Sequence, residues 1–177
     1  MIRILVVSAS LFIMSCARTV IYPLGTHPMD RISDNYYIKD TNNHHDDIVG
    51  TWFWESGETS FELVLEEFEM DSDFLQPTTF VDRVFGRYSY IVDGSVISQI
   101  NSIAGLPNFK VALIFDTPTK YNVIIHDVVS ERSKVGEFIL TSSNSATLNL
   151  WDSNGIKINH GNGQDFALPT NLVLTKQ

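Results

Sequence analysis

The sequence predicts an all-β domain, an antiparallel up-and-down β-barrel of about eight to ten strands. Short segments rich in Val, Ile, Phe, Tyr and Thr alternate with turn signals along the chain after residue 47. No stretch longer than a few residues in that part keeps apolar side chains at helical spacing. The connections are mostly short enough for hairpins, and a meander of hairpins removes its exposed edges by closing into a barrel.

The first two expected strands form a hairpin around the turn Ser56-Gly57-Glu58. Alternate residues of each strand share one face, because successive side chains of a strand point to opposite sides. The apolar row of the second strand changes parity at Glu66-Glu67, where we expect a β-bulge. The residues expected on the inner face are Ile48, Gly50, Trp52, Trp54, Phe61, Leu63 and Leu65.

The remaining strands follow at short intervals. A third strand contains the alternating residues Tyr88 and Tyr90, and Asp93-Gly94 is a strong tight-turn signal into a strand from Ser95 to Ile100. Further strands are expected at 110–115, 121–129, 136–141, 146–151, 156–158 and 171–175.

The charge and the cysteine content exclude several classes of function. The chain has 177 residues with 12 basic and 21 acidic side chains, and a formal net charge of -9. A polyanion would approach against this field, so no nucleic-acid partner is expected. A single Cys excludes a disulfide framework and any multi-cysteine zinc or iron–sulfur site.

The first sixteen residues predict an export signal with a lipid attachment site. Arg3 precedes an apolar stretch, 4–14, that is shorter than the ~20 residues of a permanent membrane helix. Ile13-Met14-Ser15-Cys16 resembles the bacterial lipobox. The resemblance implies cleavage before Cys16, which then carries a diacylglycerol and a further acyl chain such as palmitate, an anchor to the membrane. The alternative is an ordinary cleaved signal, or a short signal anchor, with a coincidental Cys.

This interpretation divides the chain into a signal peptide at 1–15, a lipidated N-terminus and tether at 16–47, and a barrel domain at 48–177. The tether is expected because its segment has no sustained period and contains several turn-forming residues. Within it, Tyr36-Tyr37-Ile38 is a candidate plug beneath the fold. No acidic cluster follows Cys16, whereas surface-export signals of related lipoproteins are acidic, so we expect the protein to face the periplasm.

The start of the barrel domain carries a family signature. Gly50-Thr51-Trp52 opens the first strand and matches the Gly-x-Trp motif of lipocalins and their relatives. The resemblance implies a lipocalin-like barrel in which Trp52 closes the base. It also implies that a basic residue of the last strand packs over this Trp, and Lys176 stands at that place in the sequence.

Nearly the whole chain resembles a family of uncharacterised Bacteroidota (flavobacterial) lipoproteins. The shared features are the lipobox, a polar stretch at 38–42, the Gly50-Thr51-Trp52 motif and an ending like that of 168–177. The resemblance implies a compact extracytoplasmic β domain on an outer membrane lipoprotein of a Gram-negative bacterium. It implies no known activity.

The polar clusters of the sequence do not predict a metal site or a catalytic centre. In His44-His45-Asp46-Asp47, neighbouring side chains of an extended chain would point apart, so a solvated linker is expected, with no metal ligands. Glu66, Glu67 and Glu69, with Asp71 and Asp73, are expected to form a charged barrel rim. The chain has no Gly-x-Ser-x-Gly, His-Glu-x-x-His or phosphate-binding glycine loop, so we expect no enzymatic activity and no cofactor.

Aromatic residues on the expected inner faces are the remaining candidates for a site. Trp54, Phe61, Tyr88 and Tyr90 could line a pocket for a small apolar ligand inside the barrel, or they could fill a packed core. The leading hypothesis is a lipid-anchored binding protein for such a ligand. The alternative is a cell-envelope structural or protein-interaction lipoprotein with a filled core, and a hydrolase with a dispersed site is a third hypothesis.

Overall fold

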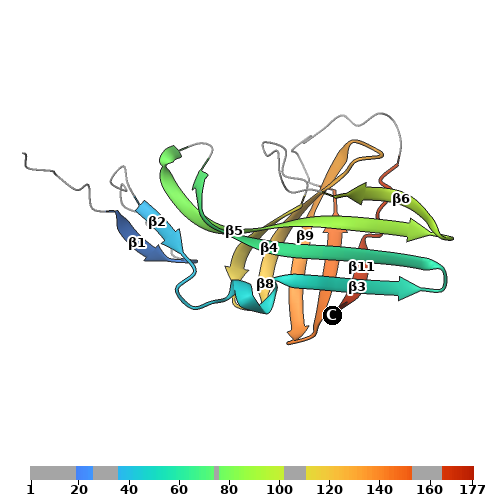
Figure 1. Ribbon diagram of the computed structural model, residues 1–177, viewed down its shortest axis with the longest axis horizontal. Helices are drawn as coiled ribbons and strands as arrows, with labels where there is room; N and C mark the ends of the chain where they lie inside the picture. The colour runs from blue at the N-terminus through green and yellow to red at the C-terminus, as the bar shows by residue number, and fades with distance from the viewer. Residues whose placement is uncertain (1–18, 26–35, 74–75, 102–110, 153–164) are drawn as a thin grey trace, which may run out of the picture.

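The computed structural model describes residues 19–25, 36–73, 76–101, 111–152 and 165–177 (Figure 1). Within these residues the chain is all-β, with one short 3-10 helix, η1 (His45–Asp47). None of the helical structure in the described ranges is long and apolar enough to cross a membrane. The expected signal peptide, Cys16 and the expected strand at 156–158 lie outside the described residues.

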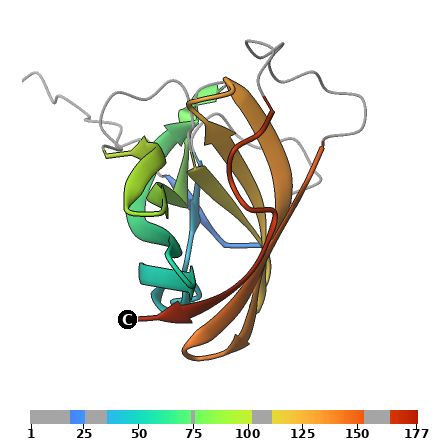
Figure 2. The same ribbon diagram turned by 90° about the vertical axis from the view of Figure 1, so that its right-hand side faces the viewer.

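Eight antiparallel strands form a closed up-and-down barrel. Each strand pairs with its neighbour along the chain, the last pairs with the first, and the order is β5-β4-β3-β11-β10-β9-β8-β7. The pairs Val84–Leu113 and Phe85–Ala112 join β5 to β7 and close the ring. Figure 2 shows the strands wrapping around the interior. The barrel strands are β3 (Gly50–Ser56), β4 (Thr59–Asp73), β5 (Gln76–Val92), β7 (Val111–Thr117), β8 (Lys120–Asp127), β9 (Arg132–Ser142), β10 (Ser145–Trp151) and β11 (Asn171–Lys176).

The predicted fold class is therefore confirmed, including the antiparallel topology and the number of strands. Among the described residues, three further strands lie outside the ring. β6 (Ser95–Ile100) pairs with the end of β5, β2 (Tyr36–Lys39) pairs in parallel with the start of β5, and β1 (Val20–Pro23) pairs with β2.

The expected β-bulge at Glu66-Glu67 is wrong. Pairing is regular there, with Glu66 opposite Phe85, and the irregularity lies between Phe68 and Asp71. Met70, inside that irregularity, has a φ of 50°. The alternation therefore continues through Glu67, which takes an inward position and contacts His45 there in place of an apolar side chain. Phe68 stays on the outer face, where its ring packs edge-on against Phe85.

The segment expected to be a tether contains a part that packs on the barrel. Residues 36–47 hold β2 and η1, and Tyr36, Tyr37, Asp40 and His45 are buried. β2 is the candidate plug of the sequence analysis, and it lies beside β5 as an additional strand. Aromatic and β-branched side chains explain why this stretch forms a strand within a polar segment.

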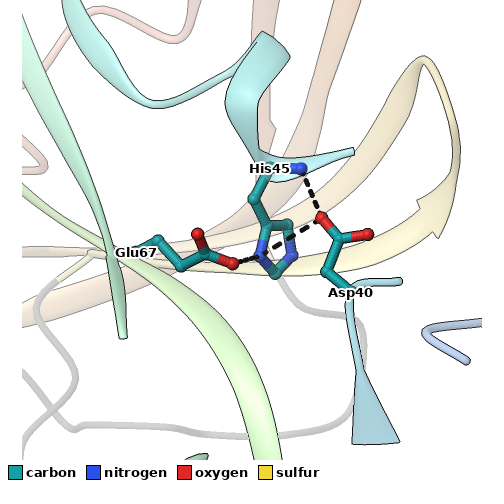
Figure 3. Close-up of side chains that lie close together, drawn as sticks. All are labelled: Asp40, His45 and Glu67. Carbon is teal, nitrogen blue, oxygen red and sulfur yellow. Dashed lines mark hydrogen bonds and ion pairs between the residues drawn. The ribbon is translucent and has the colours of Figure 1, made fainter. Parts of the chain in front are cut away.

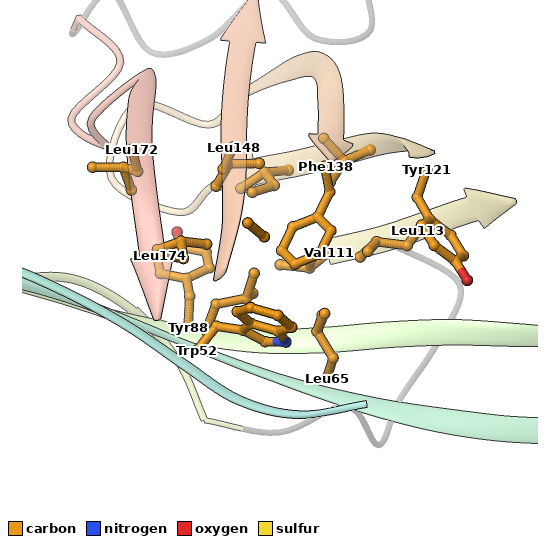
Figure 4. Close-up of a cluster of buried hydrophobic side chains, with 14 of the residues drawn as sticks. Trp52, Leu65, Tyr88, Val111, Leu113, Tyr121, Phe138, Leu148, Leu172 and Leu174 are labelled. Carbon is orange, nitrogen blue, oxygen red and sulfur yellow. The ribbon is translucent and has the colours of Figure 1, made fainter. Parts of the chain in front are cut away.

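Apolar side chains from all eight strands fill the barrel (Figure 4). The rings of Trp52 and Phe138 meet edge to face, with centroids 5.1 Å apart. A void large enough for a water molecule would leave accessible surface on the side chains around it. The central side chains have almost no accessible surface, so the interior around them is closely packed. Those with 0% exposure are Ile48, Trp52, Leu63, Val84, Tyr121, Ile125, Phe138, Ala146, Leu148 and Leu174.

Two adjacent residues of β11 test whether the interior is packed. Leu174 is 0% exposed and Val173 is 63% exposed. Leu174→Ala is expected to lower the free energy of unfolding by about 2–5 kcal/mol, because it leaves a cavity in the core. Val173→Ala is expected to change it by no more than about 0.5 kcal/mol. Urea unfolding followed by tryptophan fluorescence measures both, and equal losses would contradict the packed interior.

Candidate functional site

The base of the barrel is closed by Trp52 and Lys176. The indole Nε1 of Trp52 donates a hydrogen bond of 2.7 Å to the carbonyl of Ile48. The Lys176 ammonium lies 5.6 Å from the centre of the indole, within range of a cation–π interaction. It also donates to the carbonyls of Asp46 and Asp47, at 3.2 and 2.9 Å. These contacts hold η1 across the base.

Gly50 is required at this base for two reasons. Its φ of 127° lies in a region that L side chains rarely adopt. A Cβ at this position would also come 3.2 Å from Cε of Lys176. A side chain here would therefore strain the backbone and displace the lysine from the ring of Trp52.

The four aromatic residues proposed as an interior ligand site lie together at the opposite end of the barrel. Phe61 pairs with Trp54 on one side and with Tyr90 on the other. Phe61 and Tyr88 are buried and their rings stack, with centroids 5.9 Å apart. Trp54 and Tyr90 are partly buried against the same core. The grouping on one face follows the predicted strand alternation, and two of the four side chains are core residues.

A buried carboxylate, Asp127, connects three segments at this end. It accepts hydrogen bonds from the hydroxyls of Ser98 and Ser130, at 2.8 and 2.7 Å, and from the backbone N–H of Val129 and Ala167, at 3.0 and 2.8 Å. Burial alone would raise the pKa of Asp127, but the hydrogen bonds from Ala167, Ser130 and Ser98 outweigh it and hold this pKa below its usual value. The carboxylate therefore joins β8 to β6 and to the segment before β11.

Asp127 directly follows His126 in the sequence, and the structure separates the two side chains. Asp127 faces the interior, whereas Nδ1 of His126 lies 3.1 Å from Oγ of Ser133 on the adjacent strand. Val129 and Ser130 follow Asp127 closely in sequence, but Ser98 and Ala167 are 29 and 40 residues away, and no local pattern could have identified these two donors.

An apolar groove of about 350 Å³ lies on the outer side of the barrel wall. Phe85, Ala112 and Ile124 are register partners, so they share the outer face of the wall, opposite to the core residue Val84. The core residue Leu113 of β7 also borders the groove. Both β2 and β7 pair with β5, at neighbouring stretches of that strand, and the groove lies between them. Its lining is Leu24, Gly25, Ile38, Val81, Asp82, Arg83, Phe85, Ala112, Leu113, Ile114, Phe115 and Ile124.

The chain after β1 forms one border of the groove. The backbone N–H of Leu24 donates to the carbonyl of Lys39 at 2.7 Å, which ties this chain to the end of β2. A Cβ on Gly25 would lie 2.8 Å from the ring of Phe115, so the glycine allows the close approach to β7. Sequence reasoning missed the groove because it assigned β1 and β2 to the tether.

The carboxylate of Asp82, which lines the groove, already accepts hydrogen bonds from protein groups. The hydroxyl of Tyr37 donates to it, and so do the backbone N–H groups of Asp40, at 2.8 Å, and Met70, at 3.1 Å. Its bonds connect β2, β4 and β5. The acid thus serves the fold, and the surface left for a ligand is mainly apolar.

Asp40, His45 and Glu67 converge near the base of the barrel (Figure 3). Nδ1 of His45 lies 2.7 Å from Oε1 of Glu67 and 3.8 Å from Oδ2 of Asp40. Asp40 and His45 are buried, so the expected solvated linker is replaced by a packed turn. Of the run 44–47, only His45 joins this cluster, since His44 stacks on Phe115 and the two aspartates are exposed.

The expected charged rim is divided between two faces of β4. Glu66 forms an ion pair with Arg87, Glu67 contacts His45, and Glu69 is exposed. The side chains of Asp71 and Asp73 lie outside the described part.

Asp127→Asn is expected to lower the free energy of unfolding at pH 7 by about 1–3 kcal/mol, because it weakens the buried acceptor of four hydrogen bonds. A carboxyl group with a lowered folded-state pKa stabilises the fold above its unfolded pKa of about 3.9, and this stabilisation is lost as the pH falls through the folded value. The difference between wild type and variant should therefore shrink below about pH 4. Urea titrations between pH 3 and 7 measure it.

Asp116→Asn is the matched control. Asp116 forms a partly exposed ion pair with Lys120, and removal of such a surface pair changes stability by no more than about 1 kcal/mol. A loss in Asp127→Asn that equals the control, or that stays constant down to pH 3, would contradict the role of Asp127.

Comparison with known proteins identifies a family. Residues 1–127 match the model described as "Family of unknown function (DUF6705)". No curated protein and no solved structure matches significantly. The matched part includes every residue that lines the groove, and also Asp40, His45 and Glu67. Because the match covers more than half of the chain, the protein belongs to this family of unknown function, DUF6705.

Proposed function

We propose that the protein is a lipid-anchored, extracytoplasmic binding protein for a small apolar ligand. The observation that carries this proposal is the outer groove between β2 and β7. Its volume of about 350 Å³ lies at the lower end of the range for small-molecule sites, about 300–1,000 Å³. Four strands and the chain after β1 surround it, so a ligand would be enclosed on several sides.

The chemistry of the lining favours an apolar occupant. Ile38, Phe85, Ile114 and Ile124 present aliphatic and aromatic surface. Transfer of apolar surface from water is favourable by roughly 25 cal/mol per Å². The interior site of the original hypothesis is less suitable, because Phe61 and Tyr88 are already packed against each other. The proposed ligand therefore binds outside the barrel.

The proposal includes the membrane attachment expected from the sequence. Cys16 carries the lipid, and the chain is an outer membrane lipoprotein of Bacteroidota type that faces the periplasm. β1 begins four residues after Cys16, so the groove would lie close to the membrane surface from which an apolar molecule could be taken. The barrel is of lipocalin type, and the contact of Lys176 with Trp52 supports that assignment.

The packed interior favours a second candidate function. A barrel whose core is filled has no need of an internal ligand, and such a domain can act as a structural or protein-interaction module of the envelope. In that case the groove would receive a side chain or segment of another envelope protein. The following experiment separates the two candidates.

Ile114→Asp tests the groove. Ile114 lines the groove and is 54% exposed, so a charge there should be tolerated by the fold but should oppose an apolar ligand. The chain from residue 17 onward includes every described residue and is titrated with the neutral dye N-phenyl-1-naphthylamine. We expect the dye fluorescence to report saturable binding, and the variant to bind about tenfold more weakly or worse.

Val173→Asp and Trp54→Ala are the controls. Val173 is an exposed β-branched residue of β11 outside the groove, and Trp54 borders the originally proposed interior site. Both variants should bind the dye as the wild type does. If Trp54→Ala alone loses dye binding, the binding site lies in the barrel interior and not in the groove. Absence of saturable binding to the wild type would favour the protein-interaction candidate.

Cys16→Ser tests the anchor. The full chain should incorporate radiolabelled palmitate and fractionate with the outer membrane, and the variant should do neither. Protease added to intact cells should leave the wild-type protein uncut if it faces the periplasm. Labelling that persists in the variant would contradict lipidation at this residue.

A further inference from the structure

Three potential metal ligands approach one another although they are distant in sequence. Asp40 follows β2, His45 begins η1, and Glu67 occupies an inward position of β4 (Figure 3). The backbone N–H of His45 donates to Oδ2 of Asp40 at 2.7 Å, so the turn between these two residues is fixed. Their donor atoms, together with that of Glu67, lie within 4.8 Å of one another.

The separations fit a tetrahedral metal ion after a small adjustment. Metal–ligand distances of about 2.0–2.2 Å place neighbouring donors of a tetrahedral site about 3.3–3.6 Å apart. The two distances from Nδ1 of His45, 2.7 Å to Glu67 and 3.8 Å to Asp40, lie on either side of that value. Shifts of roughly 0.2–0.9 Å, within reach of side-chain rotation, would bring these two distances into that range, and the donors of Asp40 and Glu67, within 4.8 Å of each other, would close around the same ion.

The local charge also favours a cation. Asp40 and Glu67 bring two carboxylates to one imidazole, and the buried Asp82 accepts a hydrogen bond from the N–H of Asp40. The ring of Tyr121 lies 6.2 Å from that of His45. Burial, followed by the negative charges of Asp40, Asp47 and Glu67, raises the pKa of Tyr121. Part of this shift comes from the negative charges at the base, the largest part from burial.

We propose that Asp40, His45 and Glu67 bind a divalent metal ion of the Zn²⁺ type, which accepts one nitrogen and two oxygen ligands. Nδ1 of His45 supplies its lone pair, and the neutral ring then carries its hydrogen on Nε2. The side chain of Glu67 is 26% exposed, which provides an entry path and leaves a coordination position for water. The ion would join the N-terminal segment to β4.

The test uses the full chain in detergent with Cys16→Ser, so that a free thiol cannot bind metal. Zn²⁺ binding is measured by calorimetry, and Co²⁺ binding by its visible absorption. His45→Gln and Glu67→Gln remove one ligand each. His44→Gln and Glu66→Gln remove the same groups one residue away, where His44 stacks on Phe115 and Glu66 pairs with Arg87.

We expect saturable Zn²⁺ binding that is weakened about tenfold or more by each ligand variant and by less than about twofold by each control. The Co²⁺ spectrum should change in His45→Gln, because the nitrogen ligand is lost. If His45→Gln fails to fold, the comparison of Glu67→Gln with Glu66→Gln decides alone, since both glutamates are partly exposed. No saturable binding, or equal affinity in all variants, would overturn the proposal. Asp40, His45 and Glu67 would then serve only as a hydrogen-bonded contact between the N-terminal segment and β4.

Discussion

The pairing capacity of β5 is the constraint on which the rest of the structure depends. One edge of this 17-residue strand pairs with β4 along almost its whole length. On the other edge, each backbone N–H and C=O group can pair with only one neighbouring strand. Three strands share this edge: β2 at Thr79–Val81, β7 at Val84–Phe85 and β6 at Tyr88–Val92. Barrel closure therefore uses two residue pairs, and the flanking strands complete the edge (Figure 1).

This division of the β5 edge explains where the cavity lies. β2 pairs with β5 in parallel and β7 pairs with it antiparallel, a few residues further along, and residues of all three strands line the apolar groove. The interior, in contrast, is covered at both ends. Trp52 and Lys176 close the base, while β6 and the hydrogen bonds of Asp127 cover the opposite end. A packed barrel with an external groove differs from a barrel that encloses its ligand, although both have the same topology.

Sequence reasoning succeeded where the signal is local. Alternation placed Phe61, Leu63, Leu65 and Tyr88 on the inner face, and the structure buries all four. The prediction of the inner face failed at Glu67. The alternation of apolar residues does not reveal that His45, from another segment, contacts this glutamate at an inward position. The shift of the expected bulge has the same origin. Likewise, the polar run 40–47 was interpreted as solvated, since its partners on β4 and β5 are distant in sequence.

The sequence by itself determined the fold class, the order of the strands and the core residues of the first three strands, because period-two alternation and turn residues act over a few positions. Only the tertiary structure decided that Tyr36–Lys39 joins β5, that the groove forms outside the wall and that Asp40, His45 and Glu67 meet. These outcomes depend on which segments compete for one strand edge and on contacts between residues up to dozens of positions apart. Local propensity carries no information about either.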